Sequence, residues 1–365
     1  MLFAYPQLTA RFRQRCAALA TAILATLGMA PSSGQAAPLC QITTRPPKTP
    51  VQVAQDKLVW GSWESFEERD IRIDSAADPK PIYHVLMKRP GPPAHDKPLI
   101  VFLHGFPEFA WSWENWLKLI GNYHDAIAID LKGFGDSSKP EDLAPYDLLR
   151  VVNEIDDLAV CLGYQQVIPV GHDWGGSIAW LYAIFHASHT KALVVLSTPH
   201  PYTFFRELAK PNSEQRQRMH YLELIRQNTP ASMAEFYLGL TKDTSLFGPF
   251  YKWPRVNRLL LTNMDSTAKW DRMFSYYRVM DFPPSPVIYS DQPNQLTKAI
   301  FTVHAPTLAF YGALDPYFAL ASWNGADQFV PRLDFRKIEG AGHWINHDVP
   351  DLPFQTLDFI DTVTR

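Results

Sequence analysis

The sequence has few features that would place it outside the ordinary globular enzymes. Only 3 of its 365 residues are cysteines, too few for the disulfide framework of a small secreted domain. It shows no internal repeat and no low-complexity tract, which excludes a repeat architecture. With 46% hydrophobic residues, the chain has ample material for a large buried core.

The sequence also has no excess of positive charge. Its formal net charge is −3 at pH 7. Residues 1–36 contain three arginines and no acidic residue, so the remainder is more acidic still. A mildly acidic protein has no electrostatic basis for binding nucleic acid or an anionic membrane. We therefore expect neither as a partner.

No apolar run is long enough to cross a membrane. The run from Cys16 to Ala30 falls short of the ~20 residues that a spanning helix needs. It follows three arginines and precedes the small, polar segment Ser32–Ala37, the pattern of a secretory signal. We predict a signal peptide at 1–36, an N-terminal tail at 37–57, and export to the periplasm or the medium. An uncleaved anchor and a disordered tail are the alternatives.

Two cysteines remain after such cleavage, Cys40 in the tail and Cys161 in a helical, apolar segment. An exported protein can pair them. The apolar surroundings of Cys161 favour a buried free thiol, which is the expectation here.

From residue 58 onward, apolar segments typical of strands alternate with helical ones. The expected strands are Ile82–Met87, Leu99–Leu103, Ala126–Ile129, Val167–Val170, Ala192–Leu196, Thr307–Tyr311 and Asp334–Ile338. Leu148–Leu162 and Ser177–Phe185 are expected helices. Fully apolar strands between helices predict an α/β fold, with a mostly parallel central sheet flanked by helices.

Residues 206–298 interrupt this alternation. They show helical periodicity without a clear strand, and a segment of this length is not a bare loop. We predict an inserted helical cap at 206–298 over the carboxyl ends of the strands, where such folds bind ligands. The core then comprises 58–205 and 299–365.

A short glycine-flanked motif, Gly171-His-Asp-Trp-Gly175, lies between an expected strand and an expected helix. This is the place of a nucleophile elbow, a sharp turn that needs small residues two positions either side of its centre. The centre is Asp173, a carboxylate in place of the usual serine. We interpret Asp173 as a nucleophile; an N-capping aspartate in a plain turn is the alternative.

Two later loops supply the expected partners of this nucleophile. In this fold the order along the chain is nucleophile, acid, base. Asp315 follows the expected strand at 307–311, and His343 lies in a glycine-rich loop near the end of the chain. We therefore interpret Asp315 as the orienting acid and His343 as the base.

An oxyanion hole should come from two backbone amides, one on the residue after the nucleophile. That residue is Trp174, and the second donor is expected at Phe106. The loop around it is shaped by His104, Gly105 and Pro107, since proline fixes φ and lacks an N–H. His172 is expected to order the elbow.

Several motifs together resemble the epoxide hydrolases of the α/β-hydrolase superfamily. They are HGFPEFAWSW at 104–113, DLKGFGDSSKP at 130–140, GHDWGG at 171–176, STPHP at 197–201 and GAGHW at 340–344. The likeness extends over most of the chain from about Trp60. It implies the α/β-hydrolase fold, with an epoxide and water as the reactants and no cofactor or metal.

The resemblance also implies two tyrosines in the cap that protonate the epoxide oxygen. FSYYR at 274–278 resembles the family's second tyrosine motif and assigns Tyr277. Adjacent helical residues do not share a face, so Tyr276 is not expected to serve as well. Tyr221 matches the first tyrosine best by position; an ordinary packing tyrosine is its alternative.

An aspartate nucleophile suits attack on an sp³ carbon, because the resulting ester can be hydrolysed at its carbonyl. The alternative function is a haloalkane or haloacid dehalogenase, which uses the same Asp173 and in which the Trp174 indole binds the halide. A catalytically idle exported binding protein is a third.

His186 and His189 are spaced like metal ligands, but no third ligand is apparent and we expect them to face solvent. The sequence does not indicate an oligomeric state.

Overall fold

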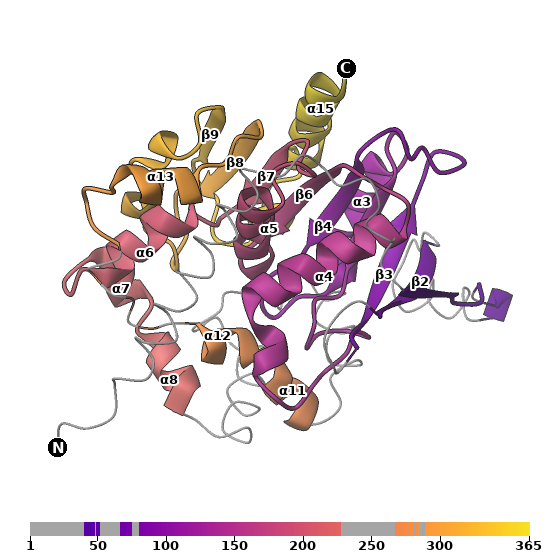
Figure 1. Cartoon of the computed structure of the whole chain (residues 1–365), viewed down its shortest axis with the longest axis horizontal. Helices are drawn as coiled ribbons and strands as arrows, with labels where there is room; N and C mark the ends of the chain where they lie inside the picture. The colour runs from indigo at the N-terminus through magenta and orange to yellow at the C-terminus, as the bar shows by residue number, and fades with distance from the viewer. Residues whose placement is uncertain are drawn as a thin grey trace. The chain divides into compact units, whose positions relative to one another are not determined.

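The computed structural model describes residues 40–47, 49–51, 66–74, 80–227, 267–280, 282, 284, 286 and 289–365 (Figure 1). The predicted signal peptide lies outside these residues. Among the helices in the described part, none is both long and apolar enough to cross a membrane.

A nine-stranded sheet organises the described residues, in the order β1-β2-β3-β5-β4-β6-β7-β8-β9. The pairs β1–β2, β2–β3 and β3–β5 are antiparallel, and the remaining pairs are parallel. The strands are β1 Cys40–Thr44, β2 Glu67–Ile73, β3 Ile82–Lys88, β4 Leu99–Leu103, β5 Ala126–Ile129, β6 Val167–His172, β7 Leu193–Leu196, β8 Thr307–Gly312 and β9 Leu333–Ile338.

Helices cover both faces of this sheet. The helices and 3-10 turns of the core are η1 Ala110–Trp113, α3 Glu114–Ile120, η2 Ala144–Tyr146, α4 Leu148–Cys161, α5 Trp174–Phe185, η4 Leu320–Trp323, η5 Ala326–Gln328, α14 Ile345–Asp348 and α15 Leu352–Thr364. In β4, Leu99, Val101 and Leu103 join one core cluster with residues of α4 and α5. Ile100 and Phe102 join the other, with residues of α3 and α15. Period-two burial on both faces explains why these strands are continuously apolar.

The predicted fold class is confirmed, and the seven predicted strands agree with β3–β9 to within two residues at each end. Two strands were not predicted. β1 and β2 form the antiparallel edge of the sheet. β1 lies in the segment predicted as a tail, so that part of the tail is a strand of the core. β1 (CQITT) is the edge strand and is mostly exposed, and β2 (EERDIRI), next to it, is only partly buried, so both sequences are polar.

The expectation of a free thiol at Cys161 is wrong. Cys161, the last residue of α4, forms a disulfide with Cys40 at the start of β1. Their Cα atoms lie 6.3 Å apart, and 121 residues separate them along the chain. The pairing depends on the edge strand, which the local sequence of Cys161 does not reveal. The bond ties the first strand to a helix of the core.

The described part of the predicted cap is helical. It contains α7 Glu214–Arg218, α8 Tyr221–Gln227, α11 Thr267–Met273, α12 Ser275–Val279 and α13 Gln295–Phe301. A further helix, α6 Pro201–Ala209, runs across the predicted boundary at 205/206. Figure 1 shows α12 near α8, below α5 in the view. Aromatic contacts between Trp174 and Tyr277 join α12 to the amino end of α5. Residues 228–266 of the predicted cap lie outside the described residues.

Candidate active site

Asp173 occupies a sharp turn between β6 and α5. Its backbone has φ 51° and ψ −118°, a conformation that non-glycine residues rarely adopt and that concentrates at functional sites. The flanking glycines make this turn possible. A Cβ at Gly171 would lie 2.2 Å from the carbonyl oxygen of Gly175, and one at Gly175 would lie 2.0 Å from that of Leu103. The turn therefore has the geometry of a nucleophile elbow.

The loop after β4 approaches the Asp173 carboxylate closely. The Phe106 amide donates a 2.8 Å hydrogen bond to Oδ1 of Asp173. A Cβ at Gly105 would lie 2.5 Å from Cβ of Asp173, so only glycine fits there. The peptide bond between Phe106 and Pro107 is cis. Trp174, the other expected amide donor, is the first residue of α5.

Two buried histidines hold the loops around Asp173. The Leu131 amide donates to Nε2 of His104, whose Nδ1 then donates to the Gly105 carbonyl. Burial lowers the pKa of His104 and favours this neutral form. His172 contacts Oε2 of Glu108 through Nδ1, at 2.9 Å, and the His343 carbonyl through Nε2. His172 thus links three loops of the site.

The predicted acid and base lie next to the nucleophile. His343 Nδ1 is 2.9 Å from Oδ2 of Asp315, and His343 Nε2 is 3.7 Å from Oδ2 of Asp173. The other oxygen of Asp315 accepts the amides of Tyr317 and Phe318. These amides fix the carboxylate so that one oxygen is left for the imidazole. Asp173, His343 and Asp315 thus form a connected triad.

Electrostatics sets the charge state of this triad. Burial lowers the pKa of His343, but the Asp315 and Asp173 carboxylates outweigh it and raise that pKa to about 10. For Asp173, burial alone would raise the pKa. The hydrogen bonds from His343 and the Phe106 amide outweigh burial, and the pKa of Asp173 lies below its usual value. In the resting state Asp173 is therefore ionised and His343 carries a proton.

Two tyrosines of the cap face the same space. Tyr221 on α8 and Tyr277 on α12 are buried, and their rings lie 6.3 Å apart. Burial, followed by the Asp173 charge, raises the pKa of each well above its usual value. Both hydroxyls therefore keep their protons and can donate them. Tyr276 instead packs against Phe134, Tyr146 and Trp174.

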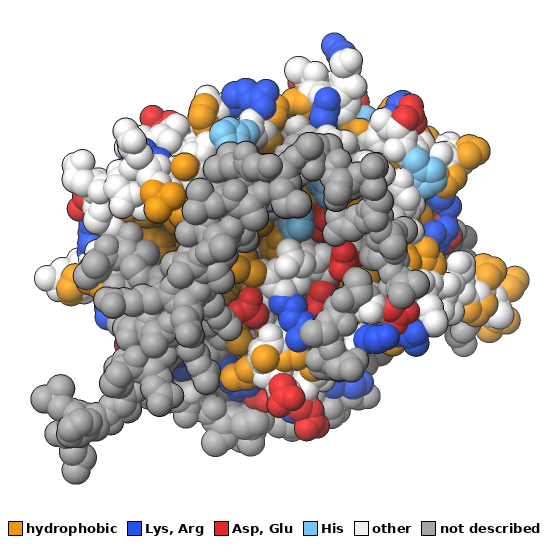
Figure 2. All heavy atoms as spheres, in the orientation of Figure 1, with side chains coloured by type: hydrophobic (Ala, Val, Ile, Leu, Met, Phe, Trp, Pro, Cys, Tyr) orange, Lys and Arg blue, Asp and Glu red, His pale blue; other side chains and the backbone are white. Residues whose placement is uncertain are grey.

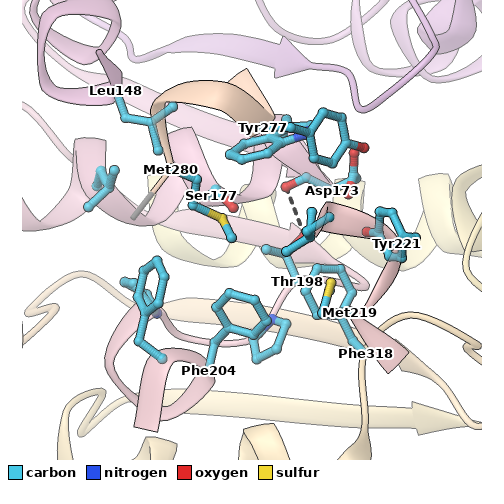
Figure 3. A pocket seen from close by; sticks show the side chains of 16 residues that line it. Leu148, Asp173, Ser177, Thr198, Phe204, Met219, Tyr221, Tyr277, Met280 and Phe318 are labelled. Atoms are coloured by element: carbon cyan, nitrogen blue, oxygen red, sulfur yellow. Dashed lines mark hydrogen bonds between the residues drawn. The ribbon is translucent and has the colours of Figure 1, made fainter. Parts of the chain in front are cut away.

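A hollow that is partly open to solvent connects these groups (Figure 3). Asp173, Tyr221 and Tyr277 contribute the ionisable side chains of its lining. The rest is mainly apolar: Leu148, Leu181, Phe204, Phe205, Met219, Leu222, Met280 and Phe318. Figure 3 shows Tyr277 beside Asp173, with Phe204 across the hollow. The site suits an uncharged molecule with a reactive sp³ carbon held at the carboxylate.

Two supporting residues were not assigned from the sequence. Glu108 is fully buried and receives contacts from His172, His347, Asn346 and the Gly105 amide. Its position directly after Pro107 could have indicated this role, because an acidic side chain inside an apolar loop needs hydrogen-bond partners. Arg218 of α7 donates to the backbone carbonyls of Asp315 and Phe318. This guanidinium ties the cap to the acid loop, a contact that no local pattern indicates.

His186 and His189 are partly exposed, as expected, but the expectation that they have no third partner is wrong. Nδ1 of each ring lies within 3.3 Å of the Asp156 carboxylate. Asp156 is on α4, some 30 positions earlier in the chain, so only the packed helices bring the three together.

Comparison with known proteins agrees with this geometry. The alpha/beta hydrolase fold family matches residues 98–350. Epoxide hydrolase 3 of Xenopus tropicalis is 30% identical over 69% of this chain and 68% of its own length. Epoxide hydrolase 1 of Caenorhabditis elegans is 28% identical over 70% of this chain, which spans 63% of that relative.

Solved structures give the same result. One, described as novel epoxide hydrolases of the alpha/beta hydrolases superfamily from metagenomes of hot environments, has a TM-score of 0.65 and 25% identity. The match covers 81% of this chain and 99% of that one. The resemblance noted in the sequence is thereby confirmed: the chain belongs to the epoxide hydrolase family of the α/β-hydrolase superfamily.

Proposed function

We propose that the protein hydrolyses epoxides to vicinal diols through an ester between the substrate and Asp173. The observation that carries the proposal is the shared hollow of one ionised carboxylate and two buried, protonated tyrosines. A carboxylate attacks carbon, and a hydroxyl stabilises the oxygen that leaves carbon. An epoxide presents both atoms side by side.

In the first step, an Asp173 oxygen attacks one ring carbon and the C–O bond to that carbon breaks. Tyr277, with Tyr221, donates a proton to the released alkoxide. The product is a hydroxyalkyl ester of Asp173 beside a tyrosinate. The negative charge of Asp173 is consumed in this step, which removes one of the groups that raise the pKa of His343.

In the second step, His343 acts as a base. Without the Asp173 charge it gives up its proton, and the proton returns to the tyrosinate through solvent. The neutral imidazole then takes a proton from water, whose oxygen attacks the ester carbonyl. The amides of Phe106 and Trp174 stabilise the oxyanion. Its collapse breaks the ester C–O bond, and the departing alkoxide takes the proton of the new Asp173 carboxyl group, which releases the diol and restores the carboxylate. Asp315 stabilises the imidazolium.

A substrate panel tests the choice of reaction. Purified enzyme should release diols from aryl and alkyl epoxides, while matched bromoalkanes should release bromide slowly or not at all. Halide release without diol formation would favour the alternative, a dehalogenase with the same nucleophile. The relatives and structures named above are epoxide hydrolases, which favours the epoxide. The proposed reactants are an epoxide and water.

We also infer that the mature protein is periplasmic or secreted. The signal-like segment at 1–36 and the disulfide of Cys40 with Cys161 support this, because structural disulfides persist in oxidising compartments. Cleavage near Ala37 leaves Cys40 in the mature chain. On the face in Figure 2, acidic and basic side chains of the described residues are interspersed, which gives no basis for a nucleic-acid partner. Edman sequencing of protein exported by a Gram-negative host should start near Ala37; cytoplasmic protein that retains Met1 would refute export.

A further inference from the structure

Away from the active site, three potential ligands converge between α4 and the carboxyl end of α5. Asp156 lies on α4, His186 caps the end of α5, and His189 follows in the next turn. One ligand atom of each lies within 4.8 Å of the other two. α4 and α5 pack side by side in Figure 1, which explains how distant residues meet.

Each oxygen of the Asp156 carboxylate faces one imidazole. His189 Nδ1 is 2.8 Å from Oδ1, and His186 Nδ1 is 3.3 Å from Oδ2. Metal–ligand bonds of ~2.0–2.2 Å in a tetrahedral site separate neighbouring ligand atoms by roughly 3.4 Å. The two histidine–carboxylate separations are close to that value, and the three ligand atoms lie within 4.8 Å of one another. Side-chain rotations would therefore place three donors around one ion.

Surrounding groups orient two of the ligands. The Tyr182 hydroxyl donates a 2.7 Å hydrogen bond to Oδ1 of Asp156, a buried side chain. His186 Nε2 is 2.9 Å from Oδ1 of Asn153. An amide oxygen only accepts, so Nε2 carries the proton and the Nδ1 lone pair is directed at the cluster. Such outer contacts are the usual way in which proteins orient metal ligands.

We propose that Asp156, His186 and His189 bind a divalent transition-metal ion, with Zn²⁺ as the expected occupant. Two imidazoles and one carboxylate are a ligand set that suits Zn²⁺, whereas Ca²⁺ and Mg²⁺ prefer oxygen ligands alone. His189 is partly exposed, with 39% of its side chain accessible, so an ion can enter from solvent. Water completes the coordination.

The proposed ion does not take part in epoxide opening. Asp173 precedes α5 and His186 follows it, and a helix of 12 residues is ~18 Å long. The ion instead links α4 to the far end of the helix that begins at the nucleophile. It should therefore stabilise the fold and leave turnover unchanged.

Isothermal titration of ZnCl₂ into the metal-free, tag-free, disulfide-bonded protein tests the site. One saturable site is expected, and His186→Ala and His189→Ala should each weaken binding at least tenfold. Tyr182→Phe should weaken it about ten- to a hundredfold, the usual effect of losing an outer contact. Co²⁺ in place of Zn²⁺ should give visible d–d absorption that His189→Ala abolishes.

His124→Ala is the matched control. His124 also contacts a carboxylate, Asp361, at 2.8 Å, but it lies outside this cluster and its loss should leave zinc affinity unchanged. Zinc should raise Tm of the wild type by a few degrees and not that of His189→Ala. Chelation should leave epoxide hydrolysis unchanged, so the outcome is independent of the proposed function.

Absence of a saturable site would overturn the proposal. So would zinc affinity that survives both histidine substitutions, or that falls equally with His124→Ala. Because His189 is partly exposed, its alanine variant should fold, and far-UV circular dichroism verifies this before each titration.

Discussion

The Phe106 amide donates a 2.8 Å hydrogen bond to Oδ1 of Asp173. This contact makes the two carboxylate oxygens inequivalent. Oδ1 already occupies the position in which an oxyanion would develop, while Oδ2 faces His343. In the proposed mechanism, one backbone donor thus stabilises the resting Asp173 carboxylate and, later, the tetrahedral intermediate.

Loss of the Tyr277 hydroxyl should slow ester formation. A positioned general acid typically contributes about a hundred- to ten-thousandfold, so Tyr277→Phe should slow alkylation of Asp173 within that range in single-turnover experiments. Tyr221→Phe combined with it should nearly abolish turnover. Ester hydrolysis should change little, since it depends on His343 and the oxyanion hole.

Tyr276→Phe is the control, because Tyr276 is equally buried but packs against Phe134 and Tyr146. It should leave alkylation within a few-fold of the wild type. The cap assignment fails if the double variant opens the epoxide at the wild-type rate. If the enzyme were a dehalogenase, Trp174→Phe would lower turnover more than Tyr277→Phe or Tyr221→Phe.

Stability should depend on pH through His343. Its pKa is raised from 6.5 to about 10, so its contribution to the free energy of unfolding is fully present below pH 6.5. That contribution is lost as the pH rises through about 10. His343→Gln removes this dependence, so urea unfolding of the two proteins should differ most below pH 6.5 and converge towards pH 10. A difference that grew with pH would contradict the protonated resting state.

Glu108 should position the catalytic loops. Glu108→Gln keeps the shape of the side chain but removes the charge that His172 and His347 face. We expect a loss of about 1–3 kcal/mol in the free energy of unfolding and a lower kcat, since His172 contacts the His343 carbonyl.

Substrate affinity should change less than kcat, because Glu108 does not line the hollow. The control is Glu339→Gln, whose side chain is 74% exposed; it should alter stability by less than about 0.5 kcal/mol. Equal effects of both changes in unfolding and in kcat would refute a positioning role.

The disulfide should stabilise the fold without serving the chemistry. It spans 121 residues, and replacing Cys40 and Cys161 by serine should lower the free energy of unfolding by about 2–5 kcal/mol. kcat at 25 °C should stay unchanged because β1 is the far edge strand. Wild-type protein reduced with dithiothreitol should unfold like the variant; an unaltered midpoint would show that the bond contributes nothing.

The sequence predicted the parts of the molecule that local patterns encode. Strands β3–β9 are continuously apolar, and the elbow at Asp173 is marked by glycines that the close approach of backbone requires. Asp315 and His343 were predicted as acid and base because each follows a strand in a fixed order. Each of these features is encoded by residues that are close together in the sequence.

What the sequence missed depends on residues far apart. β2, with its polar sequence, becomes a strand by pairing with β1 and β3. Cys161 forms its disulfide with Cys40, which lies on β1. Asp156 meets His186 and His189 because two helices pack together. Charge patterns and local periodicity do not predict contacts between residues so far apart in the chain.

The central claim is the covalent ester on Asp173, and trapping it is the most direct test. With His343→Gln the ester should form but not hydrolyse, because no base activates water. After treatment with an aryl epoxide, intact-mass analysis should show one substrate mass added per chain, and digestion should place it on the peptide containing Asp173. An adduct on a serine, or none although the wild type turns over the same epoxide, would contradict the mechanism.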